Sequence, residues 1–323
     1  MKRQIPTASW QARLGRLWSI QTLRLASQLG FAGFILYTVA LHLIVGEESG
    51  QITTSAEAYC PFGGIETLYT FVSSGGTLLS HTHLSNLAIL ASVLLLTVVA
   101  RGAFCGWICP LGALQEWVYA GSAWLQKRIR PLGRGVRALK RRAGAQQMRR
   151  FDQRGAPTLI ERLDHWLRYG RYVVLAWAVF GAAAYGTMVF RDYDPWAALL
   201  TIGELELTGG ALVLALVLVG SLFVERPWCR YACPLGAAIG LASKLSPIRI
   251  ERAGPACAGC ALCNSACPVG IPVDTRSTIT DVSCIMCLRC VDTCPKHGAL
   301  ELTLSIPGLA PQRPAHKQEA GGL

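Results

Sequence analysis

Residues 257–268 read CAGCALCNSACP, and residues 284–295 read CIMCLRCVDTCP. Each stretch has the spacing C-x2-C-x2-C-x3-C-P. Three cysteines at this spacing wrap a loop around one iron–sulfur cube, and the fourth ligates the neighbouring cube. The two stretches therefore predict two [4Fe–4S] clusters and a small α+β module of the bacterial ferredoxin kind over residues 249–305.

The crossed ligation assigns the eight cysteines to two sets. The first quartet is Cys257, Cys260, Cys263 and Cys294, and the second quartet is Cys284, Cys287, Cys290 and Cys267. Zinc is the main alternative, but a zinc site generally needs four ligands from two C-x2-C knuckles, and this pattern fits two identical sets poorly. Structural disulfides are disfavoured because we expect the module in the reducing cytoplasm.

The chain as a whole is too apolar for an ordinary soluble domain. Its 323 residues are 52% hydrophobic and 15% charged, and the mean hydropathy is +0.36. Four stretches approach the ~20 apolar residues that cross a bilayer core. They are residues 25–45, 84–100, 172–189 and 207–224.

The distribution of basic residues predicts the orientation of these spans. Lys and Arg number five before the first span, none in the next connection, then fifteen, one, and finally ten after the last span. This alternation predicts four spans with both termini in the cytoplasm, in the inner membrane of a bacterium. The net charge of +12 then reflects membrane topology and contact with lipid headgroups, and nucleic acid is not an expected partner.

The membrane part contains an internal repeat. Residues 104–113 read FCGWICPLGA and residues 228–237 read WCRYACPLGA, each after the second span of a pair. Both halves start inside, so the repeat is parallel and its pseudo-twofold axis runs along the membrane normal. The sequence therefore predicts a mainly α fold, with a four-helix transmembrane core built from two parallel repeats.

The repeated motifs bring four more cysteines to the cytoplasmic side. We call Cys105, Cys109, Cys229 and Cys233 the core quartet. Three interpretations stay open for them: ligation of a further metal or iron–sulfur centre, redox-active dithiols, and tightly packed structural turns.

These patterns divide the chain into six segments. They are a cytoplasmic tail (1–24), a first membrane repeat (25–126), a basic cytoplasmic linker (127–169), a second membrane repeat (170–248), the two-cluster module (249–305) and a disordered tail (306–323). We expect the basic linker to help dock the module, because two oxidised clusters make the module acidic.

The repeat, the core quartet and the two C-terminal motifs together resemble the NapH-type quinol dehydrogenase membrane proteins. They also resemble the membrane portion of NosR-type electron-transfer proteins. The similarity covers about residues 25–304. It implies a membrane core with a cytoplasmic two-[4Fe–4S] module that passes electrons between the quinone pool and a redox partner. Residues 60–64 read CPFGG where NapH-type chains usually have Asp-Pro, and only the second half keeps Asp194-Pro195.

Quinol oxidation requires a proton acceptor near a membrane interface. The candidates near the outer face are His42, Cys60, Glu66 and Asp194. Histidine titrates near neutral pH, and Cys60 and Asp194 occupy equivalent loops of the two halves. The alternative is that all four are ordinary loop or interface residues.

We therefore expect a membrane-bound iron–sulfur protein that relays electrons between quinol or quinone and a redox protein in a respiratory chain of the denitrification type. It would be an electron-transfer subunit and not a stand-alone enzyme. Two other functions stay open. One is an assembly or copper-reducing factor that uses the core quartet, and the other is a redox-sensing regulator.

Overall fold

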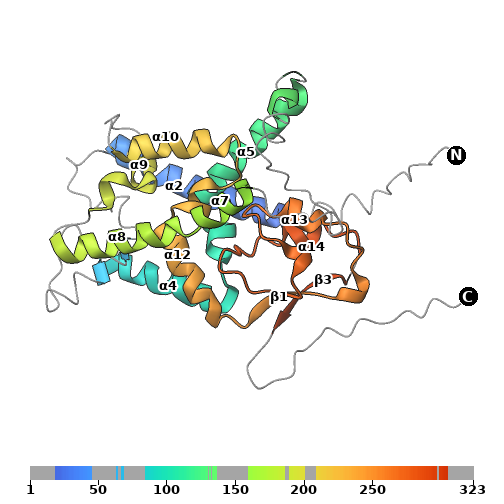
Figure 1. Ribbon diagram of the computed structural model, residues 1–323. Coiled ribbons are helices and arrows are strands. Elements are labelled where there is room, and N and C mark those ends of the chain that lie inside the picture. The colour runs from blue at the N-terminus through green and yellow to red at the C-terminus, as the bar shows by residue number, and fades with distance from the viewer. Residues whose placement is uncertain are drawn as a thin grey trace, which may run out of the picture.

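The structure is a computed structural model of the full chain. It describes residues 19–45, 63–64, 67–68, 84–129, 131, 133–136, 159–185, 189–200, 209–296 and 298–304. Most of these residues are helical, and a small sheet lies near the C-terminus (Figure 1). The expectation of a mainly α chain with a small α+β module is confirmed.

The helical part consists of two halves that follow each other in the chain. The first contains α2 (Ile20–Val45), α4 (Leu84–Ala100), η3 (Phe104–Ile108) and α5 (Pro110–Arg128). The second contains α7 (Leu159–Leu167), α8 (Gly170–Tyr185), η5 (Arg191–Tyr193), α9 (Pro195–Leu200), α10 (Gly209–Ser221), α11 (Pro227–Tyr231), α12 (Pro234–Ala242) and η7 (Ser243–Leu245).

The two halves make equivalent contacts with each other. Helix α5 packs against α2 of its own half and α10 of the other, and α12 packs against α8 of its own half and α4 of the other. Helices α5 and α12 both begin at a proline, which tolerates the first helical position because its missing N–H would be unpaired there. Because α5 and α12 each contact helices of both halves, they join the two halves into one packed unit.

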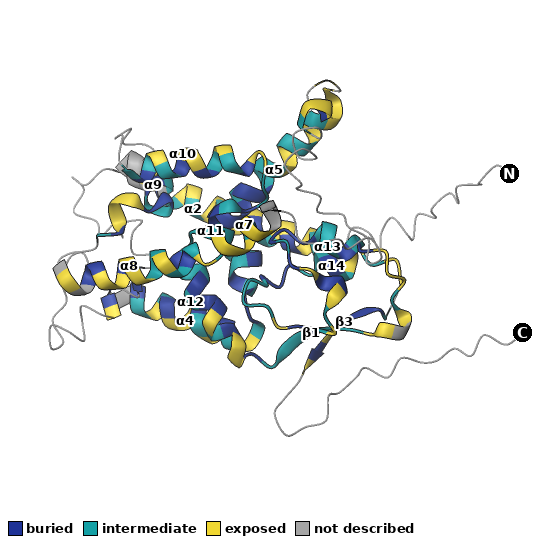
Figure 2. Cartoon of the chain, viewed as in Figure 1, coloured by how far each residue is buried: buried dark blue, intermediate teal, exposed yellow. Residues whose placement is uncertain are grey.

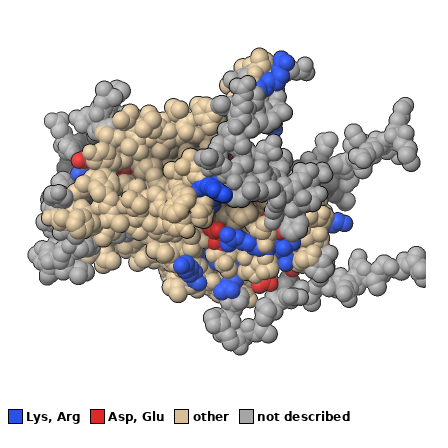
Figure 3. Space-filling view, in the orientation of Figure 1, with Lys and Arg blue, Asp and Glu red and all other residues tan. Residues whose placement is uncertain are grey.

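The helices present apolar side chains outward. On α8, Val173 and Phe180 are exposed, and on α10 so are Leu212 and Leu216. Figure 2 shows exposed residues along both helices, and Figure 3 shows a broad surface of the helical part without charged residues. One described stretch, Ile20–Leu41, is long and apolar enough to cross a bilayer, whereas Asn86–Ala100 and Gly209–Ser221 are apolar but shorter.

Three of the four helices differ from the predicted spans, and α10 ends at Ser221 and not at residue 224. Helix α2 begins at Ile20 and not after residue 24, because Arg24 is buried against Glu116 and does not belong to a solvated tail. Helix α8 ends at Tyr185, and residues 189–200 turn back into the helical part.

The linker and the tails are only partly described. Helix α7 lies within the predicted linker of residues 127–169, whereas residues 137–158 and the tails at 1–18 and 305–323 lie outside the described residues.

The C-terminal module is a three-stranded antiparallel sheet with short helices. Strand β1 (Ile248–Arg252) lies between β2 (Thr278–Ile279) and β3 (Leu300–Leu304). Alternation along β1 turns Ile250 into a core that also contains cysteines of both quartets. The connections carry η8 (Gly254–Ala256), α13 (Leu262–Ala266), η9 (Val273–Thr275) and α14 (Arg289–Asp292).

Candidate metal centres

The two C-x2-C-x2-C loops have the same backbone path. Two and four residues after the first cysteine, the chain adopts left-handed φ angles: 65° at Gly259 and 53° at Ala261, and 48° at Met286 and 56° at Leu288. Each of the three residues other than glycine costs roughly 1–2 kcal/mol in this region. Such strain persists at sites whose geometry the surrounding structure enforces.

The left-handed residues turn backbone N–H groups toward the sulfurs. The N–H of Gly259 donates to the Cys257 thiol and lowers its pKa. Successive N–H groups in such a turn form a concave anion-binding site. Both loops are therefore built to stabilise negative charge on sulfur.

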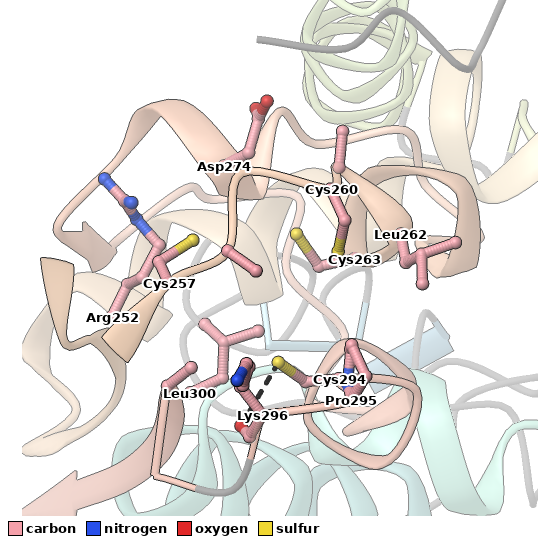
Figure 4. Close-up of a pocket in the computed structure, with 13 residues that line it drawn as sticks. Arg252, Cys257, Cys260, Leu262, Cys263, Asp274, Cys294, Pro295, Lys296 and Leu300 are labelled. Carbon is pink, nitrogen blue, oxygen red and sulfur yellow. Dashed lines mark hydrogen bonds between the residues drawn. The ribbon is translucent and has the colours of Figure 1, made fainter. Parts of the chain in front are cut away.

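The first quartet surrounds one cavity. Cys257, Cys260, Cys263 and Cys294 all line a space of about 390 Å³, including the part open to solvent. In Figure 4, Cys294 lies across this space from the three loop cysteines. Cys260 is exposed, so this site reaches the protein surface.

The second quartet lies deeper. Cys267, Cys287 and Cys290 are buried in the core of the module, and Cys284 packs against that core. Burial raises the pKa of Cys267 to about 11, with a further contribution from Cys287. Burial also raises the pKa of Cys284 to about 12, and Cys287 and Cys267 add to this shift. The four sulfurs are therefore close enough to interact electrostatically.

The donor chemistry of both quartets fits [4Fe–4S] clusters. Each cluster needs four thiolates, and the fourth cysteine of each motif lies with the loop of the other motif. Cys294 shares the cavity of the first loop, and Cys267 interacts with the second. Among the described residues, no three His, Cys, Asp or Glu side chains converge on a single-ion site.

The core quartet sits in two matching turns. The N–H of Cys109 donates to the Phe104 carbonyl at 3.0 Å, and the N–H of Cys233 donates to the Trp228 carbonyl at 2.9 Å. These five-residue turns are wider than α-helical ones and are frequent at functional sites. Cys109 and Cys233 then take extended backbone angles, as residues before proline do.

The four core sulfurs lie close together where the two halves meet. Burial raises the pKa of Cys109 to about 11, and Cys229 of the other half raises it further. Burial also raises the pKa of Cys233, again with contributions from Cys229 and Cys105. The structure thus brings the core quartet together, although its two pairs are separated by more than a hundred residues in the chain.

The module is docked on the core quartet through the second-quartet loop. Gly106 lies so close to residues 284–288 that a Cβ would overlap a carbonyl oxygen of that loop. Gln21 Nε2 and Trp107 Nε1 each donate to another carbonyl of the loop at 3.0 Å. Cys105 packs against the module core that contains the second quartet. Arginines add to these contacts: Arg101 donates to the Asp281 carbonyl at 3.1 Å, and Arg168, within the predicted linker, donates to the Gly270 carbonyl at 2.9 Å. Linker residues 137–158 lie outside the described range.

A buried carboxylate joins three arginines at this junction. Glu116 forms ion pairs with Arg24 (2.5 Å), Arg226 (2.8 Å) and Arg289 (3.7 Å). Arg289, in the second-quartet loop, also pairs with Glu225. Burial alone would raise the pKa of Glu116, but Arg226 and Arg24 outweigh it and lower the pKa to about 2. Glu116 is therefore ionised at every physiological pH.

Sequence reasoning did not select Glu116 or Arg226. One signal was available, because Glu116 is the single acidic residue between positions 101 and 151, a stretch rich in Lys and Arg. A lone carboxylate in such a stretch has a strong electrostatic reason to pair. No local pattern distinguishes Arg226 from the other arginines.

Of the predicted outer-face residues, the structure describes the side chain of Asp194. Cys60 and Glu66 lie outside the described residues, as does the side chain of His42. Asp194 is buried and caps α9, and its Oδ1 accepts from the N–H of Trp196 at 3.0 Å. Burial raises the pKa of Asp194 to about 7, although this hydrogen bond opposes the shift.

A chain of rings connects this region to the core quartet. The ring centroids of Tyr193 and Trp177 are 5.8 Å apart, and those of Trp177 and Phe190 are 6.0 Å apart. Phe190 stacks on Trp228 at 6.4 Å, and Trp228 directly precedes Cys229. Residues 189–200 thus place Asp194 inside the helical part, next to a row of packed rings that leads to the core motif.

Comparison with known proteins also finds two equivalent segments in the helical part. A family described as a 4Fe–4S binding domain matches the chain twice, over residues 82–131 and 207–252. Each match contains one pair of the core quartet and none of the eight C-terminal cysteines. The double match supports the internal repeat independently of the structure.

Several known proteins are similar in sequence to this chain. The chain is 27% identical to YccM of Escherichia coli over 259 residues (78% of this chain, 64% of YccM). It is 28% identical to the ferredoxin-type protein NapH of the same organism over 229 residues (67% of this chain, 68% of NapH). It is 29% identical to the regulatory protein NosR of Pseudomonas aeruginosa over 208 residues (60% of this chain, 25% of NosR).

The chain is therefore similar to the NapH- and NosR-type ferredoxin-type proteins. The resemblance predicted from the motifs is confirmed. The chain spans less than two thirds of YccM and about a quarter of NosR, so the similarity covers only part of those proteins. No solved structure shows a significant similarity to this chain.

Proposed function

We propose that this iron–sulfur protein relays electrons between membrane quinol and a redox protein in the cytoplasm, through [4Fe–4S] clusters held by the first and second quartets. The observation that carries the proposal is the asymmetric position of the two quartets. The second-quartet loop is packed against the core motif, whereas the first quartet lines a cavity with the exposed Cys260. Electrons would pass from the membrane core to the second quartet, then to the first, and then to the partner.

Four membrane spans are part of this proposal. Helices α2, α4, α8 and α10 overlap the four predicted apolar stretches, and the strong alternation of basic residues orients them. Their outward apolar side chains support contact with lipid, since soluble proteins rarely expose such extended apolar surface. The equivalent contacts of α5 and α12 support two parallel repeats.

Asp194 is our candidate for the proton acceptor in quinol oxidation. A quinol releases two electrons and two protons as it becomes quinone, and each [4Fe–4S] cluster accepts one electron. Asp194 lies inside the helical part, and a pKa of about 7 suits a general base at physiological pH. The rings between Tyr193 and Trp228 provide a packed path from this region to the core quartet.

The relay can be tested with anaerobically purified full-length protein, a soluble quinol analogue and EPR. We expect the quinol to reduce both clusters of the wild type. Cys260→Ser should lose the first cluster, keep a quinol-reducible second cluster, and fail to pass electrons to a soluble acceptor. Cys287→Ser should lose the second cluster and leave the first cluster beyond the reach of quinol.

Iron content per chain controls for cluster assembly in both variants. A wild type whose clusters stay oxidised with every quinol analogue would refute the quinol relay. Undiminished transfer to the soluble acceptor by Cys260→Ser would refute the order of the two clusters.

A further inference from the structure

Arg226 is a fully buried cation beside the core quartet. Its side chain has 0% exposure, and its backbone takes a left-handed φ of 55°. Nε donates to Glu116 at 2.8 Å and Nη1 donates to the Cys105 carbonyl at 2.5 Å. Among the described residues, Nη2 is buried and has no hydrogen-bond partner. A buried donor without a partner costs roughly 1–3 kcal/mol, and more when it is charged.

The chain makes room for this guanidinium. A Cβ on Gly112 would lie 2.8 Å from Arg226 Nη1 and 3.2 Å from the Cys105 carbonyl oxygen. Gly236 occupies the same position of the motif in the second half, but there the nearest atoms belong to Cys233 and Cys229. The glycine of the first motif therefore serves to admit one arginine side chain next to the core quartet.

The buried ion pairs leave positive charge without a partner. Among the described residues, Arg24, Arg226 and Arg289 face two carboxylates, Glu116 and Glu225, so the group carries one surplus positive charge. Besides Glu116, the acidic groups that act most strongly on Arg226 are the thiols of Cys229, Cys109 and Cys105. A second buried arginine, Arg171, lies near Cys105 and forms no ion pair among the described residues.

This charge pattern discriminates between the interpretations of the core quartet. Neutral thiols, a disulfide or a purely structural turn would leave the buried positive charge unbalanced, at a cost of several kcal/mol. Four thiolates around a metal centre would supply the missing negative charge. Zinc is redox-inert, whereas Cys105 packs against the module core that contains the second quartet. An anionic electron carrier at this junction accounts both for the surplus positive charge around Arg226 and for the packing of Cys105 against the module.

We infer that the core quartet holds a third, anionic iron–sulfur centre, and that Arg226 is its built-in counter-charge. The inference rests on the proposed relay, in which this centre stands between the membrane and the second quartet. Arg226 is a positioning residue: it touches the Cys105 carbonyl and Glu116, and its charge favours the more negative, reduced state of the centre. Removing that charge lowers the reduction potential of this centre and leaves the other two unchanged.

Elemental analysis of anaerobically purified full-length protein tests the centre itself. The first and second quartets account for about eight irons per chain, so we expect more than eight in the wild type, without copper or zinc. Cys229→Ser should lose only the surplus iron and sulfide. A wild type with about eight irons, or with copper or zinc in place of the surplus, would overturn the inference.

A redox titration followed by EPR tests the role of Arg226. In Arg226→Gln, the ratio of reduced to oxidised third centre at a fixed potential should fall about tenfold, which equals about 59 mV for one electron. Arg226→Lys keeps the charge and should stay near the wild type. Arg276→Gln removes a half-exposed arginine of the module and is the matched control.

Equal potentials in wild type and Arg226→Gln would refute the counter-charge, provided that about eight irons show the quartets of the module intact. Failure of the relay proposal looks different. In that case the surplus iron would be present and tuned by Arg226, but quinol would reduce none of the centres.

Discussion

Replacing Glu116 by glutamine should destabilise the protein more than the loss of any other carboxylate charge in the part of the chain that the structure describes. The pKa of Glu116 falls from 4.5 to about 2 on folding, because Arg226 and Arg24 together outweigh the effect of burial. A lowering of this size corresponds to about 3 kcal/mol. Removing one member of a buried ion pair typically costs about 3–5 kcal/mol, since the other charge is left unpaired. The two routes give the same magnitude.

Thermal unfolding of the detergent-solubilised holo-protein measures this effect. At about 2 °C per kcal/mol for a large domain, Glu116→Gln should lower Tm by about 7 °C. Glu251→Gln is the matched control, because Glu251 lies on β1 and forms no ion pair among the described residues. The control should stay within about 1 °C of the wild type.

The pH dependence gives a second check. A carboxylate with a depressed pKa contributes stability that is fully present above its unfolded pKa and is lost as the pH falls through its folded pKa. The difference between wild type and Glu116→Gln should therefore be constant from pH 5 to pH 8. A variant as stable as the control, or a difference that varies within this range, would refute the assignment of Glu116 as the hub of the junction.

Two further predictions concern docking and the outer region. Gly106→Ala places a Cβ against a backbone carbonyl of the second-quartet loop. We expect the free energy of unfolding to fall by about 1–3 kcal/mol and quinol to reduce the second cluster more slowly. Gly121→Ala is the control, because a Cβ there meets no described neighbouring residue within 4 Å, and it should not slow this reduction. Asp194 has a raised pKa of about 7, so its protonated form is favoured in the folded protein, and stability should fall by about 1 kcal/mol from pH 6 to pH 8. Asp194→Asn should remove this decline and slow quinol oxidation, whereas Asn at the exposed Asp192 should do neither; a decline that persists in Asp194→Asn would assign it to another group.

The contact between the helices and the module distinguishes this chain from a soluble ferredoxin. In a free ferredoxin both cluster loops can face solvent, but here the second-quartet loop is covered by Gly106, Trp107 and α2. Covering one loop leaves the other as the natural point of contact with a partner. A partner that docks on the first quartet would approach the cavity that Arg252 and Lys296 also line.

Motif spacing was sufficient wherever ligands are close in the chain. The C-x2-C-x2-C loops, the repeated C-x3-C-P motifs and the family resemblance followed from residues within a dozen positions of one another. Apolar stretches also predicted the four helices, because their side chains interact with their surroundings one turn at a time. The boundaries at α2 and α8 differed, since Arg24 and residues 189–200 take their conformations from distant partners.

Sequence by itself therefore determined that two sets of four thiols lie in a small C-terminal module that follows a helical, apolar part of the chain, because short loops and periodic side chains follow local rules. Tertiary structure alone decided which quartet faces the helices, that Glu116 gathers arginines from three parts of the chain, and that Arg226 lies beside the core sulfurs. These are outcomes of burial. A charge acquires a large energy only when distant segments exclude water around it, and no local pattern records which segments will meet.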